Sequence, residues 1–149
     1  MAESETQTAE KTEKPIVPFL RLPEKQGEKA YLLGTKCTAC GAAYVGDRLA
    51  CGKCCAVGGF EPVKFSDHGT LHTFSIVYQT APGIPVPFVA AIIDLPEGTS
   101  IRANIEGIEP DPDKLVPLLG KRVDMYTEKV RTDREGNDVI AFKFRPAQA

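Results

Sequence analysis

Tryptophan is absent from this chain and histidine is scarce, with only His68 and His72. An enzyme that activates a cysteine nucleophile needs histidines placed to move its proton, so the sequence offers little for that mechanism. No apolar run approaches the length of about 18 residues that a membrane span requires. The opening segment, MAESETQTAEKTEKP, is acidic and polar where a signal peptide has an apolar stretch. We therefore expect a cytoplasmic protein.

A surplus of one charge is also missing. The chain has 18 Lys and Arg residues against 20 Asp and Glu residues, for a net charge of −2. Without a positive field the chain has no general attraction for polyanions, so nucleic acid is not the first partner to expect. Its 149 residues, 42% of them hydrophobic, suffice for one domain or for a domain with a small module.

Composition divides the chain into four segments. The first has no large apolar side chain after Met1, so burial cannot offset the entropy of ordering it. The second is broken by three prolines, and Phe19, Leu20 and Leu22 give it apolar anchors. The third contains every cysteine, and the fourth alternates short apolar runs with turns. We predict a disordered tail (1–14), an N-terminal arm (15–34), a zinc ribbon (35–60) and a barrel domain (61–149).

The cysteines form two C-x-x-C pairs separated by ten residues, Cys37 with Cys40 and Cys51 with Cys54. Two such turns can point four thiolates at one centre, which is the ligand set of a structural Zn²⁺. In a reducing compartment, clustered cysteines are more often metal ligands than disulfides. We therefore predict one structural zinc ion per chain, whose closed shell leaves no position for a substrate. A redox dithiol and a disulfide are the minority alternatives.

The surrounding residues refine this prediction. Gly41 and Gly52 are expected to relieve the backbone where it curls round the ion. The stretch CTACGAAY also looks like a rubredoxin knuckle, so iron is an alternative metal. Cys55 is the fifth thiol, and with no histidine near it in sequence it has little visible activation. A spare ligand is therefore favoured over a nucleophile.

Five apolar runs after Phe60 are typical of strands. In the first, His72, Phe74, Ile76 and Tyr78 are expected to share one face. Between the third and fourth runs, DPDKLVPLLG suggests a short helix capped by an aspartate. Five strands with a helix at this place are the element order of an OB-fold, a five-stranded Greek-key barrel. The expected strands are Thr70–Tyr78, Phe88–Leu95, Ser100–Ile105, Lys121–Val130 and Val139–Phe144.

The loop YQTAPGIPVPF, from Tyr78 to Phe88, is the best candidate for contact with a partner or an acyl group. Its prolines make it stiff, so it can present an apolar surface at little ordering cost. An ordinary long barrel loop is the alternative interpretation. The candidate contact residues are Tyr78, Pro82, Ile84, Pro85 and Phe88.

Other polar residues favour structural roles. His68 is expected in a turn and His72 on a strand face, while Asp111 and Asp113 are interpreted as helix-capping residues. No glycine-rich phosphate loop occurs. We identify no active site in the sequence.

The order of these motifs resembles an OB-fold, acyl-CoA-associated family with a rubredoxin-like zinc ribbon. The resemblance covers about residues 31–146. It depends on the ribbon cysteines, the strand GTLHTFS, the loop and strand APGIPVPFVAAIIDL, the segment LLGKRVD and the terminal FKFRP. The proline-broken segment before the ribbon departs from the family's pattern.

The resemblance implies that the chain has a partner. Members of this family typically accompany thiolase-like enzymes, including aldolases of steroid side-chain breakdown and thiolases of aromatic or aryl-succinate breakdown. By this analogy the chain would be a non-catalytic subunit of a hetero-oligomer. It would dock on a thiolase-like catalytic subunit and help to shape its acyl-CoA entrance.

Two other functions stay open at this point. OB barrels and zinc ribbons also bind single-stranded nucleic acid, although the mixed charges of the barrel segment argue against a basic stripe. A free-standing acyl-CoA binder would need a pocket that the sequence does not reveal. The cations of the barrel segment could meet the phosphates of coenzyme A.

Overall fold

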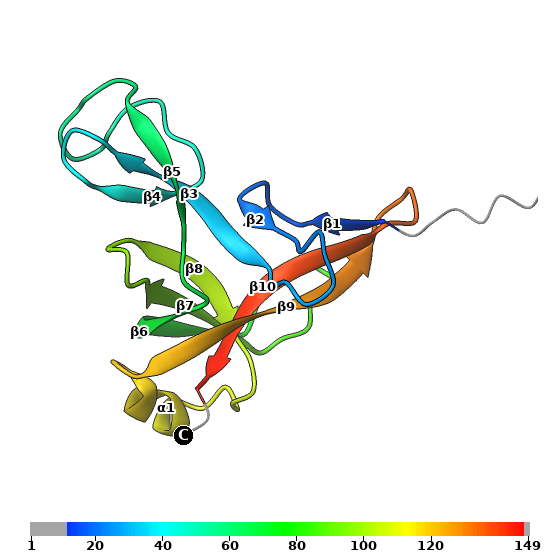
Figure 1. Cartoon of the computed structure of the whole chain (residues 1–149). Helices are drawn as coiled ribbons and strands as arrows, with labels where there is room; N and C mark the ends of the chain where they lie inside the picture. The colour runs from blue at the N-terminus through cyan, green and yellow to red at the C-terminus, as the bar shows by residue number, and fades with distance from the viewer. Residues whose placement is uncertain (1–11, 148–149) are drawn as a thin grey trace, which may run out of the picture.

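The computed structural model describes residues 12–147. A closed barrel forms the larger part, and a smaller sheet that bears the cysteines extends from it (Figure 1). The barrel consists of β6 (His68–Val77), β7 (Phe88–Asp94), β8 (Ser100–Ile105), β9 (Arg122–Thr132) and β10 (Asp138–Pro146).

The barrel has the predicted element order. Its strands follow the order β10-β8-β7-β6-β9, and β9 pairs again with β10 to close the ring. Helix α1 (Pro112–Leu115) and the 3₁₀ turn η1 (Val116–Leu118) lie between β8 and β9. Asp111 caps α1, because its carboxylate accepts a hydrogen bond from the Asp113 N–H at 3.0 Å. The predicted mainly β fold with a five-stranded barrel is confirmed.

Strand β6 departs from strict alternation at His72. Its register with β7 shifts after Leu71, so that His72 is exposed while Phe74 and Ile76 pack against the core. Tyr78 follows the end of the strand and is 67% exposed. The expectation that all four predicted residues share one face is therefore wrong, because a bulge inserts one residue into the alternation.

The smaller sheet, which we call the ribbon, is organised around β3 (Tyr31–Cys37). This strand pairs antiparallel with β2 (Leu20–Arg21), β4 (Ala43–Val45) and β5 (Phe60–Lys64). The sheet thus runs past both ends of the predicted ribbon segment. Its first strand begins within the predicted arm, and its last ends within the predicted barrel segment.

The N-terminal arm contributes a further strand. Strand β1 (Glu13–Pro15) pairs in parallel with the start of β10. Glu13 and Lys14, which we assigned to the disordered tail, therefore belong to a sheet. The edge of β10 supplies their backbone partners, and the Lys14 ammonium lies 2.7 Å from the Glu135 carboxylate. Residues 1–11 of the predicted tail lie outside the described residues.

One hydrophobic core joins the three parts of the molecule. Leu20 comes from β2, Leu32 from β3, and Leu71 and Phe144 from the barrel, and each is at most 1% exposed. Phe65 packs in the same core at the junction between ribbon and barrel. The ribbon is therefore anchored at its base to the barrel, while its cysteine end projects away (Figure 1).

Candidate functional site

Two turns of the same construction carry the predicted metal ligands. In the first, the Gly41 N–H donates to the Cys37 carbonyl at 2.8 Å, and in the second the Cys55 N–H donates to the Cys51 carbonyl at 3.0 Å. Strand β3 ends at Cys37, so the ribbon sheet holds the first turn in place. The Cys37 N–H and the Cys51 N–H each donate to the carbonyl five residues later, which closes both turns.

The four predicted sulfurs meet at one point. The Sγ atoms of Cys37, Cys40, Cys51 and Cys54 all lie within 4.8 Å of one another. Two of the separations are 3.7 Å, between Cys37 and Cys54, and 3.5 Å, between Cys40 and Cys51. A disulfide bond would require about 2.05 Å. Four sulfurs placed tetrahedrally about 2.3 Å from a metal ion are about 3.8 Å apart, so the cluster fits a metal ion.

The electrostatics of the cluster also fit a cation. The hydrogen bond from the Tyr44 hydroxyl lowers the pKa of Cys51 to about 5. A backbone hydrogen bond from Ala56 lowers the pKa of Cys54, but burial and the hydrogen bonds among the thiols outweigh it and raise that pKa to about 12. The sulfurs therefore cannot all ionise near neutral pH on their own. A metal ion would supply the charge that offsets four thiolates.

Cys55 does not belong to this cluster. It occupies the place that Gly41 has in the first turn, and like that glycine it has a positive φ, 62° against 77°. Its thiol is exposed and is absent from the group of four sulfurs. The turn thus imposes a left-handed backbone on Cys55, which disfavours a non-glycine residue, without bringing its thiol to the other four sulfurs.

Gly52 does not have the role that we expected. Its backbone is not in the left-handed region, so it does not relieve the turn as Gly41 does. A Cβ atom at this position would lie 3.4 Å from the Tyr44 hydroxyl oxygen. This is an ordinary van der Waals contact, so Gly52 is simply a neighbour of Tyr44, which the sequence analysis did not single out. The sequence feature that could have pointed to Tyr44 is the presence of an aromatic residue four positions after Cys40.

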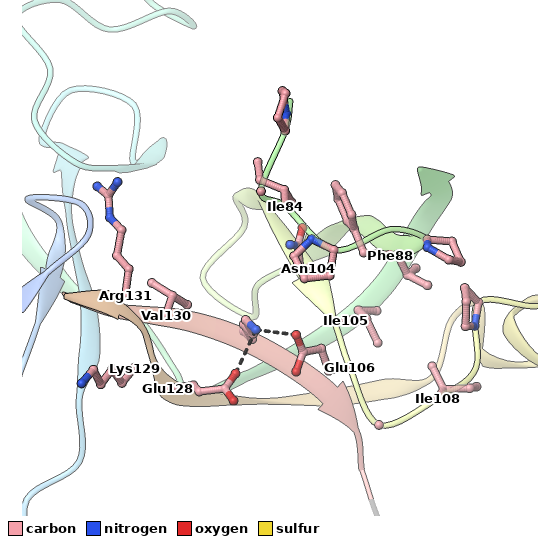
Figure 2. A pocket seen from close by; sticks show the side chains of 18 residues that line it. Ile84, Phe88, Asn104, Ile105, Glu106, Ile108, Glu128, Lys129, Val130 and Arg131 are labelled. Atoms are coloured by element: carbon pink, nitrogen blue, oxygen red, sulfur yellow. Dashed lines mark hydrogen bonds and ion pairs between the residues drawn. The ribbon is translucent and has the colours of Figure 1, made fainter. Parts of the chain in front are cut away.

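The proline-rich loop forms one wall of a groove of about 740 Å³. The groove runs between this loop, the end of β8 and the outer half of the β9–β10 hairpin, and Figure 2 shows Ile84 and Phe88 across from Val130 and Arg131. Four of the five candidate contact residues line the groove, namely Pro82, Ile84, Pro85 and Phe88. Tyr78 does not line it.

A charged cluster that the sequence did not reveal occupies the groove. The Lys143 ammonium pairs with Glu106 and with Glu128, the latter at 2.8 Å, and Figure 2 marks both interactions. The hydrogen bond from Lys143 holds the pKa of Glu106 below its ordinary value. Burial and the hydrogen bond to Glu106 raise the pKa of Tyr126 to about 12. These residues come from β9, from β10 and from the residue that follows β8, so no local pattern predicts them.

The remaining candidates have structural partners. His68 lies 3.3 Å from the Asp67 carboxylate, and His72 lies 2.8 Å from that of Asp94. Both histidines therefore pair with carboxylates rather than with a thiol. Among residues 12–147, the structure contains no helix long and apolar enough to cross a membrane.

Comparison with known proteins identifies relatives of similar length. The family model described as the C-terminal OB-fold domain of ChsH2 matches residues 62–128. A DUF35 domain-containing scaffold protein of Methanothermobacter thermautotrophicus is 34% identical over 120 residues, which cover 77% of this chain and 86% of that protein.

Two further relatives bear the name benzoylsuccinyl-CoA thiolase subunit BbsA. The one from Geobacter metallireducens is 29% identical over 97% of this chain and 98% of its own length. The one from Thauera aromatica is 32% identical over 86% of this chain and 85% of its own length. Among solved structures, a chain of the Ltp2-ChsH2(DUF35) aldolase shares the fold, with a TM-score of 0.59 and 24% sequence identity. The match covers 79% of this chain and 86% of the aldolase chain.

Proposed function

The chain belongs to the DUF35 family, which includes the C-terminal OB-fold domain of ChsH2. We propose that it is a non-catalytic subunit of a thiolase-type acyl-CoA enzyme complex. The main support is its similarity, over nearly the whole length of both chains, to a protein named as a thiolase subunit. The relative from Methanothermobacter thermautotrophicus is named as a scaffold protein, and a scaffold protein acts by binding other proteins.

The chemistry of the site is consistent with an accessory role. A thiolase needs a thiol nucleophile with histidines beside it, whereas both histidines here pair with aspartates. A metal ion held by four cysteines has no open coordination position for water or substrate. The centre would stabilise the ribbon, in the way that structural zinc sites do.

Two exposed apolar features support docking on another protein. Ile84 and Val86 in the proline-rich loop are 50% and 44% exposed. At the far end of the ribbon, Leu49 and Val57 are 89% and 85% exposed, and the bridge between Ala50 and Val57 keeps them near each other. Large apolar side chains gathered at a rigid surface are typical of interaction sites.

The finer parts of the proposal concern the groove and the metal. The groove lined by the loop would contact the acyl-CoA or the catalytic subunit, with Arg131 as a cation at its rim. We propose zinc as the metal because four thiolates with no redox role are its usual ligands, and iron is the alternative. The benzoylsuccinyl-CoA reaction is the specific candidate, and it depends on the names of two relatives.

The first experiment is affinity purification of the tagged chain from its native host. Mass spectrometry of the co-purifying proteins and elemental analysis would be done on the same sample. A thiolase-like chain in near one-to-one amount, with about one zinc per copy, is the expected result. A metal-loaded chain that brings no such partner would contradict the proposal.

Binding of single-stranded nucleic acid has less support. A strand-binding surface needs several basic side chains free to meet phosphates on one face. Here Arg122, Lys129 and Lys143 are each paired with a carboxylate. Titration with a short single strand and with an acyl-CoA would separate this function from the proposed one and from that of a free-standing acyl-CoA binder.

A further inference from the structure

Tyr44 connects the two cysteine turns. It lies on β4, directly after the first turn, and its hydroxyl donates a hydrogen bond to the Sγ atom of Cys51 in the second turn at 3.3 Å. Cys51 is only 3% exposed, so this hydrogen bond is shielded from water. The Lys53 N–H also donates to the same sulfur, at 3.4 Å.

The surrounding backbone is arranged to admit the hydroxyl. Tyr44 is held in register opposite Thr35 of β3, which fixes the direction of its side chain. On the other side, Gly52 lies next to Cys51 and beside the hydroxyl, where even a Cβ atom would make only an ordinary contact at 3.4 Å. The position of β4 in the ribbon sheet therefore sets the contact between Tyr44 and Cys51.

The charges on either side of Tyr44 are opposite. Four thiolates around a divalent ion leave two net negative charges, which need compensation in a partly buried site. The guanidinium carbon of Arg48 lies 4.5 Å from the centre of the Tyr44 ring. The tyrosine thus stacks its face on a cation and directs its hydroxyl toward a thiolate.

We propose that Tyr44 is a positioning residue for the metal centre, which holds Cys51 on the metal through its hydroxyl and thereby slows release of the ion. Arg48 supports this by stacking on the ring and offsetting part of the negative charge. The inference depends on metal occupancy, as put forward in the proposed function, but it does not depend on the identity of the partner.

The test compares metal release from the full-length wild type and from Tyr44→Phe. The variant keeps the ring and its stacking on Arg48 and removes only the hydroxyl. Because loss of an outer hydrogen bond typically costs 10-fold to 100-fold in metal affinity, we expect release into excess chelator to be about 10-fold faster. With Co²⁺ in the site, the thiolate-to-cobalt charge-transfer bands of Tyr44→Phe should also shift, because the donor to one sulfur is lost.

Tyr31 provides a matched control. It lies on β3, and its ring also stacks against a cation, with the Lys64 ammonium 4.4 Å from the ring centre. Tyr31→Phe should release metal at the wild-type rate with unchanged cobalt bands. Wild-type release and unchanged bands in Tyr44→Phe would overturn the proposal, and so would equal acceleration in both variants.

A second variant tests the contribution of Arg48 separately. Arg48→Gln leaves the hydroxyl in place and removes the stacked cation. We expect release that is several-fold faster than from the wild type, whereas release at the wild-type rate would overturn the role of Arg48. Because these assays need only the purified chain, a negative result here would leave the accessory-subunit function untouched.

Discussion

At the scale of single residues, Cys55 and Gly41 occupy equivalent positions in the two cysteine turns. Both have a left-handed backbone, which glycine adopts freely and which costs other residues roughly 1–2 kcal/mol. Cys55 therefore pays a local conformational penalty without joining the four clustered sulfurs. This difference makes the two turns suitable for paired substitutions.

We predict that Cys55→Gly stabilises the protein and leaves its metal content unchanged. The gain should be about 0.5–1 kcal/mol, because relief of backbone strain exceeds the larger unfolded-state entropy of glycine. Chemical denaturation and elemental analysis would measure both effects. Gly41→Ala should lose about 1–2 kcal/mol. Loss of metal from Cys55→Gly would show instead that this thiol is a ligand.

The carboxylate of Glu106 provides a prediction about pH. Its hydrogen bond with Lys143 holds its pKa below the ordinary value of 4.5, so its ionised form is favoured by folding. The stability that it contributes is therefore present above that ordinary value and lost as the pH falls through the lowered folded pKa. Glu106→Gln should unfold more easily than the wild type at pH 7, with a difference that shrinks below about pH 4.5.

Urea denaturation of Glu106→Gln at several pH values would measure this trend. Glu61→Gln is the control, because Glu61 is exposed on β5 and belongs to no ion pair in the described part of the chain. A difference between Glu106→Gln and the wild type that stays constant from pH 7 to pH 3 would contradict the argument.

At the scale of elements, the N-terminal arm is part of the folded unit. Leu20 on β2 is 1% exposed within the common core, and the rings of Phe19 and Phe142 have centroids 6.0 Å apart. Strand β1 extends the sheet along β10. The arm thus covers a face and an edge of the β9–β10 hairpin that would otherwise meet water.

We predict that Leu20→Ala destabilises the whole protein by about 2–5 kcal/mol, the usual cost of truncating a buried leucine. Thermal unfolding would measure the loss. Ile16→Ala removes a side chain of the same arm that is 44% exposed, so it should cost much less. Equal, small effects of the two substitutions would mean that the arm does not stabilise the fold.

The ribbon and the barrel should respond differently to removal of the metal. The cysteine turns would depend on the proposed ion, whereas the barrel strands form a closed ladder around the common core. Chelation should abolish amide protection between Cys37 and Gly59 and leave β6 to β10 protected, as measured by hydrogen exchange. Cys40→Ser should have the same local effect. Global unfolding on chelation would contradict this division.

At the scale of the whole molecule, the two apolar surfaces proposed for docking lie at separate places. One is the proline-rich loop beside the barrel groove, and the other is the far end of the ribbon. A partner that contacts both would hold the ribbon and the barrel at once. This arrangement suits an accessory subunit better than a small free-standing binding protein.

We predict that the combined substitution Ile84→Asp and Pro85→Gly weakens binding to the catalytic subunit or lowers acyl-CoA turnover by the complex. The aspartate places a charge in an apolar contact, and the glycine restores flexibility that binding must then remove. Co-purification and turnover would be measured together. Val116→Asp is the control, since Val116 is 55% exposed on η1 and does not line the groove. Unchanged affinity and turnover would remove the loop from the proposed function.

The sequence predicted what local patterns encode. The third strand was predicted with its observed bounds, and the other four barrel strands were placed within about two residues. Asp111 was recognised as a capping residue because capping depends on neighbours in the chain. By contrast, the bulge at His72 depends on the register between β6 and β7, and the pairing of β1 with β10 joins strands far apart in sequence. No pattern within one segment reveals them.

The sequence by itself determined the barrel and the presence of two cysteine turns, because alternation and cysteine spacing act over a few residues. Only the tertiary structure decided that the four sulfurs meet, that Cys55 stays outside their cluster and that Tyr44 reaches Cys51. The groove around Lys143 likewise exists only because β8, β9 and β10 converge. These features depend on distances between segments, which pairing and packing of the whole chain set.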